Sequence, residues 1–117
     1  GIAGHTNLLK ALIANQDETV SKEHCKGMEG LVAEALKHTL EDGPDQGPVL
    51  DATIIAQYQR MTHYGITGFG TVAAFSKALK LTDDNRQLRA AVKELYVADE
   101  LMTELAEAAV NVDAAAE

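Results

Sequence analysis

Three glycines, Gly65, Gly68 and Gly70, interrupt the stretch QYQRMTHYGITGFGT (residues 57–71), which otherwise has the composition of a long helix. Each glycine costs about 1 kcal/mol relative to alanine in a helix interior. Apolar or glycine positions nevertheless recur at alternating intervals of four and three residues, the spacing of a helix-packing seam. They are Ile54, Tyr58, Met61, Gly65, Gly68, Val72, Phe75 and Leu79. The pattern predicts one uninterrupted helix over residues 48–80.

The position of the glycines on this seam suggests a reason for two of them. Gly65 and Gly68 both belong to the seam, so we expect a neighbouring helix backbone to approach closely there. Gly70 lies off the seam, and the pattern gives no reason for it.

Two shorter helices precede the long one. The first is predicted over residues 2–15. The second is predicted over residues 21–41, with Thr19 or Ser21 as its N-terminal cap and Gly43 at its end. The connector GPDQGP, which contains both prolines, follows directly.

A second long helix is predicted over residues 83–112, capped by Thr82 or Asp83. Its seam consists of Leu88, Val92, Leu95, Asp99, Met102, Ala106 and Ala109. Four amphipathic helices with short connectors predict an all-α antiparallel bundle of two long and two shorter helices. We expect a single domain over residues 1–117, because this length suits one core.

The composition argues against several functions. Ten Lys and Arg against 18 Asp and Glu give a formal net charge of −8, which disfavours binding to nucleic acid or to anionic membranes. No apolar stretch is long enough to span a membrane, and no signal peptide is visible. The only cysteine, Cys25, lies in an apolar run, so we expect a small buried hydrophobe without a redox role. Such cysteine usage suits the cytoplasm.

Few residues offer chemistry, since phosphate loops, paired-cysteine motifs and nucleophile elbows do not occur in the sequence. His24 and His38 are predicted near helix ends, where solvent exposure explains them. His5 shares a helix face with Leu9, so it is either a partly buried histidine or a metal ligand. His63 is predicted to point to the flank of its helix or to solvent.

Asp99 raises a sharper question, because an unpaired carboxylate in a bundle seam is costly. A hydrogen bond to Tyr58, to Thr62 or to a neighbouring helix would satisfy it. A metal ion is the alternative that the sequence leaves open.

Three segments together resemble a known family. CKGMEGLVAEA (25–35), QYQRMTHYGITGFGTVAAF (57–75) and VKELYVADELMTELA (92–106) resemble, in this order, the YciE/YciF-type ferritin-like stress proteins. The corresponding family segments read C-x-A-M-E-G-L-x-E-E-A, V-E-H-Y-E-I-A-x-Y-G-T and L-E-E-E-K-A-T-D-x-K-L-T-x-L-A. The resemblance implies a ferritin-like bundle, in which carboxylates and, in some members, histidines hold two metal ions between long helices.

The resemblance also implies that such a dimetal site is eroded here. Two family glutamates fall on Thr62 and Gly65, neither of which supplies an oxygen anion. The residues left at matching positions are His5, Glu94 and Asp99. A glycine at position 65 would remove a ligand and let the helices close over the gap.

The resemblance further implies that a long family helix before Ile2 is absent, which would leave an apolar groove uncovered. Our first interpretation is therefore a non-catalytic, stress-associated ferritin-like protein without a cofactor, which forms a homodimer or a larger homo-oligomer. The second is an iron- or manganese-dependent oxidase or iron-handling protein that uses His5, Glu94 and Asp99. The third is a helical module whose groove binds another protein's helix.

Overall fold

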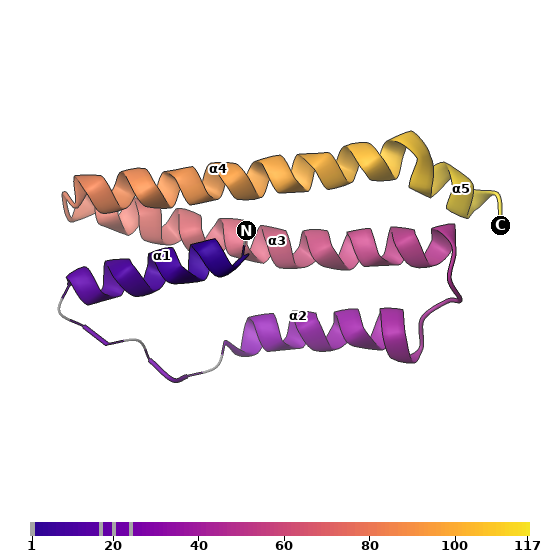
Figure 1. The fold of residues 1–117 in the computed structure, drawn as a ribbon, viewed down its shortest axis with the longest axis horizontal. Helices are drawn as coiled ribbons and strands as arrows, with labels where there is room; N and C mark the ends of the chain where they lie inside the picture. Colours follow the sequence, from indigo (N-terminus) through magenta and orange to yellow (C-terminus); the bar gives the residue numbers. More distant parts are fainter. Residues whose placement is uncertain (1, 17, 20, 24) are drawn as a thin grey trace.

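Both long helices predicted from the sequence are present, and they lie antiparallel to each other (Figure 1). The computed structural model describes residues 2–16, 18–19, 21–23 and 25–117. Every regular element in these residues is helical, which confirms the all-α class. The elements are α1 (Ile2–Asn15), α2 (Lys26–Leu36), the π-helical turn η1 (Lys37–Glu41), α3 (Pro48–Ala78), α4 (Thr82–Leu105), the π-helical turn η2 (Ala106–Val110) and α5 (Asn111–Ala115).

The helix α3 runs without a break through all three glycines, as its sequence pattern predicts. It begins with Pro48 in its first turn, where the missing N–H of proline costs no helical hydrogen bond. Beyond its end, Lys80 adopts a left-handed conformation with φ of 59°, and the N–H of Leu81 donates to the carbonyl oxygen of Ser76 at 2.9 Å. This tight turn leads directly into α4.

The predicted packing face of α3 is wrong by about one residue. The buried residues are Ile55, Gln57, Thr62, Ile66, Ala73 and Ser76. Val72, Phe75 and Leu79 of the predicted seam are instead 43%, 62% and 69% exposed. A shift of one residue turns the face by about 100°, and the buried face escaped the hydrophobic pattern because it includes small and polar side chains. On α4 and η2 the predicted face is largely confirmed, with Leu88 of α4 and Ala106 of η2 buried.

The prediction of a close backbone approach at Gly65 and Gly68 is also wrong. A Cβ atom at Gly65 would lie 3.6 Å from Cδ1 of Leu95, which is an ordinary contact, and a Cβ at Gly68 or Gly70 would meet open space. A close approach occurs instead at Gly27, where a Cβ would lie 2.5 Å from the hydroxyl oxygen of Tyr64. The glycine that the packing of α2 on α3 requires is therefore in α2.

The caps predicted for two helices differ from those observed. Cys25 caps α2, which begins at Lys26, so Thr19 and Ser21 lie well before the helix. The N-cap position of α4 is Leu81, which makes no side-chain cap hydrogen bond. The predicted stop at Gly43 is confirmed, because η1 ends at Glu41 and a Cβ at Gly43 would lie 2.5 Å from the carbonyl oxygen of Thr39.

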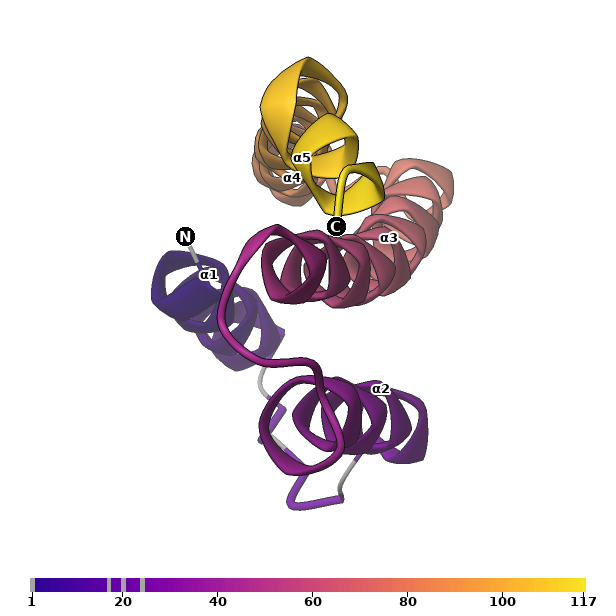
Figure 2. The ribbon, with the colours of Figure 1, turned by 90° about the vertical axis from the view of Figure 1, so that its right-hand side faces the viewer.

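The helices α1 and α2 lie along the long pair toward its opposite ends (Figures 1 and 2). Leu12 of α1 packs against Ala73 of α3 and Leu88 of α4, and this small core is extended by Leu8, Leu9 and Phe69. Ile2, at the start of α1, is 80% exposed.

The molecule is elongated, with principal extents of 54, 29 and 19 Å. Its radius of gyration is 17.1 Å, whereas a compact chain of this length has one of roughly 13 Å. Each short helix covers only part of the long pair. Apolar side chains around Val72, Phe75 and Leu79 are left exposed, whereas Leu88 is covered.

Candidate functional site

A layer of polar side chains lies between the middle of α3 and the C-terminal part of α4. We call it the polar layer, and it consists of Gln59, Thr62, His63, Asp99 and Thr103. Nε2 of Gln59 donates to the hydroxyl oxygen of Thr103 at 2.8 Å and to the carbonyl oxygen of Asp99 at 3.3 Å. The hydroxyl of Thr62 donates to the carbonyl oxygen of Tyr58 in its own helix at 2.9 Å.

Asp99 is the charged residue of the polar layer, and its partner is His63. Oδ2 of Asp99 lies 2.9 Å from Nε2 of His63, whose side chain is 58% exposed. Oδ1 of Asp99 is buried without a hydrogen-bond partner. The predicted flank position of His63 is confirmed, and the partner of Asp99 is indeed on a neighbouring helix. The contact between these two residues was not foreseen.

A second histidine–carboxylate pair joins α1 to α4. Nε2 of His5 lies 2.7 Å from Oε2 of Glu94, and the two side chains are 13% and 69% exposed. The imidazole also stacks obliquely on Phe69, with ring centroids 5.4 Å apart and an interplanar angle of 58°. His5 is therefore a partly buried histidine with a carboxylate partner, the first of its two sequence-based interpretations.

These two pairs do not fit a dimetal centre. His5 and Glu94 form one pair and Asp99 belongs to the other, and the described residues contain no group of three or more potential ligands that could hold a metal ion. Thr62 and Gly65 add no carboxylate, and the hydroxyl of Thr62 is already used within its helix. Dimetal bundles of this kind draw several carboxylates and histidines from four helices, and the described residues bring no such set together.

The thiol of Cys25 is exposed, so the prediction of a buried hydrophobe is wrong. As the cap of α2, its Sγ accepts a hydrogen bond from the N–H of Met28 at 3.4 Å and lies 3.0 Å from the hydroxyl of Tyr64. The hydrogen bond with Tyr64 is the main reason that the pKa of the Cys25 thiol lies below its ordinary value, and the Met28 N–H adds to this. The same interaction raises the pKa of Tyr64.

His38 has no part in these clusters. His38 is exposed and lies 2.8 Å from Glu34 one helical turn earlier, which agrees with its predicted solvated position. The prediction for His24 concerns a residue outside those that the structure describes.

The fold and its polar contacts define a helical protein whose long pair is joined partly by a polar layer that includes the His63–Asp99 pair. The chain belongs to the DUF892 family, a domain of unknown function whose family model matches residues 1–115. Protein YciF of Escherichia coli (strain K12) is 30% identical over 87 residues, which cover 74% of this chain and 51% of YciF. The chain thus spans about half the length of this relative, and the resemblance drawn from the sequence is confirmed. No solved structure matches the chain.

Within the described residues, none of the helices combines the length and the apolar character that crossing a membrane requires.

Proposed function

We propose that the chain is a non-catalytic, ferritin-like and stress-associated protein of the YciF type that works as a homodimer or larger homo-oligomer. The exposed apolar face of α3 is the observation that carries this proposal. We call it the α3 stripe, and it consists of Val72, Phe75 and Leu79, which are 43%, 62% and 69% exposed at successive helical turns. A groove of about 270 Å³ continues the stripe between α1 and α3, where Leu9 and Phe69 line it.

The total surface of the chain supports an extensive interface. A compact monomer of this mass exposes roughly 6,200 Å², whereas this chain exposes 8279 Å². The excess of about 2,000 Å² is larger than the roughly 800 Å² that each partner contributes to a standard interface. A second copy is the occupant we favour, because a two-fold axis lets the same stripe cover itself.

The acidic charge of the chain does not oppose this arrangement along the stripe. Lys77 and Lys80 are the charged residues closest in sequence to Phe75 and Leu79, and acidic residues do not occur between Asp51 and Asp83. Two copies of the stripe can therefore meet without bringing carboxylates of this segment together.

Sedimentation equilibrium over a range of micromolar concentrations tests this proposal. We expect the wild-type chain to associate, and Phe75→Glu with Leu79→Glu to shift the equilibrium to monomer because each carboxylate would be buried unpaired. Val112→Glu is the control for one such change, since Val112 is 64% exposed and lies in α5 away from the stripe.

A wild-type chain that stays monomeric at every concentration would overturn the proposal and favour the partner-binding module. Loss of association in Val112→Glu as well would show that charge rather than the α3 stripe controls assembly. The oxidase or iron-handling alternative has no supporting contact, since its three residues lie in two separate pairs.

A further inference from the structure

The cationic residues of this acidic chain are concentrated at the turn between α3 and α4. Residues 77–93 contain five of the ten Lys and Arg residues but two of the 18 Asp and Glu residues. This segment is therefore locally positive in a chain whose net charge is −8. The net charge of the whole chain conceals this local excess of positive charge.

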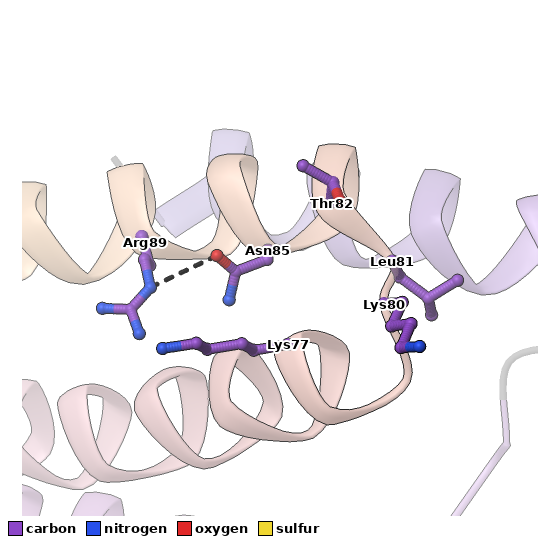
Figure 3. A pocket seen from close by; sticks show the side chains of 6 residues that line it. All are labelled: Lys77, Lys80, Leu81, Thr82, Asn85 and Arg89. Atoms are coloured by element: carbon purple, nitrogen blue, oxygen red, sulfur yellow. Dashed lines mark hydrogen bonds between the residues drawn. The ribbon is translucent and has the colours of Figure 1, made fainter.

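Three of these cations surround one pocket of about 420 Å³ (Figure 3). Lys77 approaches it from α3, Lys80 from the turn and Arg89 from α4, and Leu81, Thr82 and Asn85 complete the lining. In Figure 3, Lys77 and Arg89 extend from facing helices toward the same end of the pocket, whereas Lys80 points toward the other end.

The acidic residues nearby are engaged elsewhere. Oδ1 of Asp83 pairs with Arg86 at 3.1 Å, and Oδ2 of Asp84 accepts a hydrogen bond from Gln16 at 3.4 Å. Among the described residues neither Lys77 nor Lys80 has a carboxylate within ion-pair distance, and the same holds for Arg89. Two like charges that face each other without a counterion repel, so a bound anion would relieve this repulsion.

A neutral side chain holds Arg89 in this position. Nε of Arg89 donates to Oδ1 of Asn85 at 3.3 Å, while Nδ2 of Asn85 donates to the carbonyl oxygen of Ala73 in α3 at 2.7 Å. Asn85 therefore ties Arg89 to the facing helix through Nε and leaves the terminal guanidinium nitrogens for a ligand. Lys77 and Lys80 lie near the C-terminal end of α3, where the helix dipole favours positively charged side chains. Arg89 lies too far from a helix end for the dipole to account for its position.

We propose that this pocket binds a small oxyanion of the phosphate class, held between Lys77 and Arg89. Arginine presents planar donors that match phosphate oxygens, and lysine adds a compact charge. A ligand with two phosphate groups, such as pyrophosphate, also extends toward Lys80. The site is separate from the polar layer and does not depend on the proposed self-association.

Calorimetric titration with inorganic phosphate and with pyrophosphate at low salt tests the proposal. We expect pyrophosphate to bind more tightly than phosphate, and Lys77→Gln with Arg89→Gln to weaken pyrophosphate binding by about tenfold or more. The matched control is Lys10→Gln with Arg60→Gln, which removes the same charges from α1 and from the middle of α3 and should change the affinity by less than about twofold.

Amide chemical shifts locate the ligand independently of the heat of binding. We expect the shifts that change on adding pyrophosphate to cluster in residues 77–89. No binding by the wild-type chain would overturn the proposal, and so would equal losses in the test and control variants, which would indicate non-specific attraction. Binding to vesicles of anionic lipid with no response to pyrophosphate would also contradict it, because the source of the phosphate would then be a membrane surface.

Discussion

The ring of Tyr64 lies so close to Gly27 that a Cβ atom there would be 2.5 Å from the tyrosine hydroxyl. Because this hydroxyl is also 3.0 Å from Sγ of Cys25, a single side chain of α3 fixes the first turn of α2. The contact explains why α2 begins where it does. Substitutions at the two glycines of α2 should therefore have different effects, because a Cβ at Gly30 would meet open space.

Gly27→Ala should lower the free energy of unfolding by about 1 kcal/mol, the lower end of the range for overpacking, because Tyr64 is partly exposed and can move aside. Gly30→Ala is the matched control and should raise it by up to about 1 kcal/mol, because alanine is the better helix former. Urea unfolding of the two variants measures both changes. If Gly27→Ala proves as stable as Gly30→Ala, Tyr64 does not constrain α2.

Tyr64→Phe should make the thiol of Cys25 less reactive near neutral pH. The Tyr64 hydroxyl lowers the pKa of Cys25 by stabilising the thiolate, so its removal should raise this pKa and reduce the thiolate fraction at a given pH. The rate of alkylation by iodoacetamide, measured against pH, should therefore shift to higher pH. Tyr96→Phe, in α4, is the control. An unchanged profile for Tyr64→Phe would mean that Tyr64 does not stabilise the thiolate.

The His63–Asp99 pair should contribute a measurable but modest coupling energy. His63→Ala removes the partner of Oδ2 of Asp99, whose Oδ1 already has no hydrogen-bond partner. We expect this substitution to lower the free energy of unfolding by about 0.5–1.5 kcal/mol. The exposure of His63 limits this cost because water can replace the imidazole.

Combining His63→Ala with Asp99→Asn tests the pair directly, because a neutral amide loses less than a carboxylate when its partner is removed. The double variant should recover part of the loss, with a coupling of about 0.5–1 kcal/mol in a double-mutant cycle. Fully additive effects would show that the two side chains do not interact in solution.

The sequence predicted the long helices well and the packing of α3 poorly, for a physical reason. The alternating four-and-three spacing identifies a helix and its most apolar face, but it does not say which face meets the neighbouring helix. Here the apolar face ends in the exposed Phe75 and Leu79, while the smaller Thr62, Ala73 and Ser76 are buried. Small side chains allow close packing, and a hydrophobic pattern gives them little weight.

The candidate site was also predicted only in part. Asp99 was identified because a carboxylate stands out in an apolar seam, and this holds in the structure, where it is half-buried. His63 was correctly placed at the flank of its helix, but because the seam of α3 was drawn one residue away, this flank was not recognised as the side that meets Asp99. The role of Cys25 was missed because a cap depends on where a helix starts, and cysteine is not among the residues usually expected there.

The final prediction is that the purified chain does not hold two redox-active iron ions. A dimetal centre needs several carboxylates to balance its charge, whereas Thr62 and Gly65 supply none and Asp99 is already paired with His63. Metal analysis of protein purified without chelator, together with the rate of ferrous oxidation, measures both properties, and Asp99→Asn serves as the comparison. Two iron atoms per chain, or rapid oxidation that disappears in Asp99→Asn, would contradict the prediction. Such a result would favour the iron-handling alternative, because it would mean that His5, Glu94 and Asp99 rearrange around metal ions and abandon the pairs they form here.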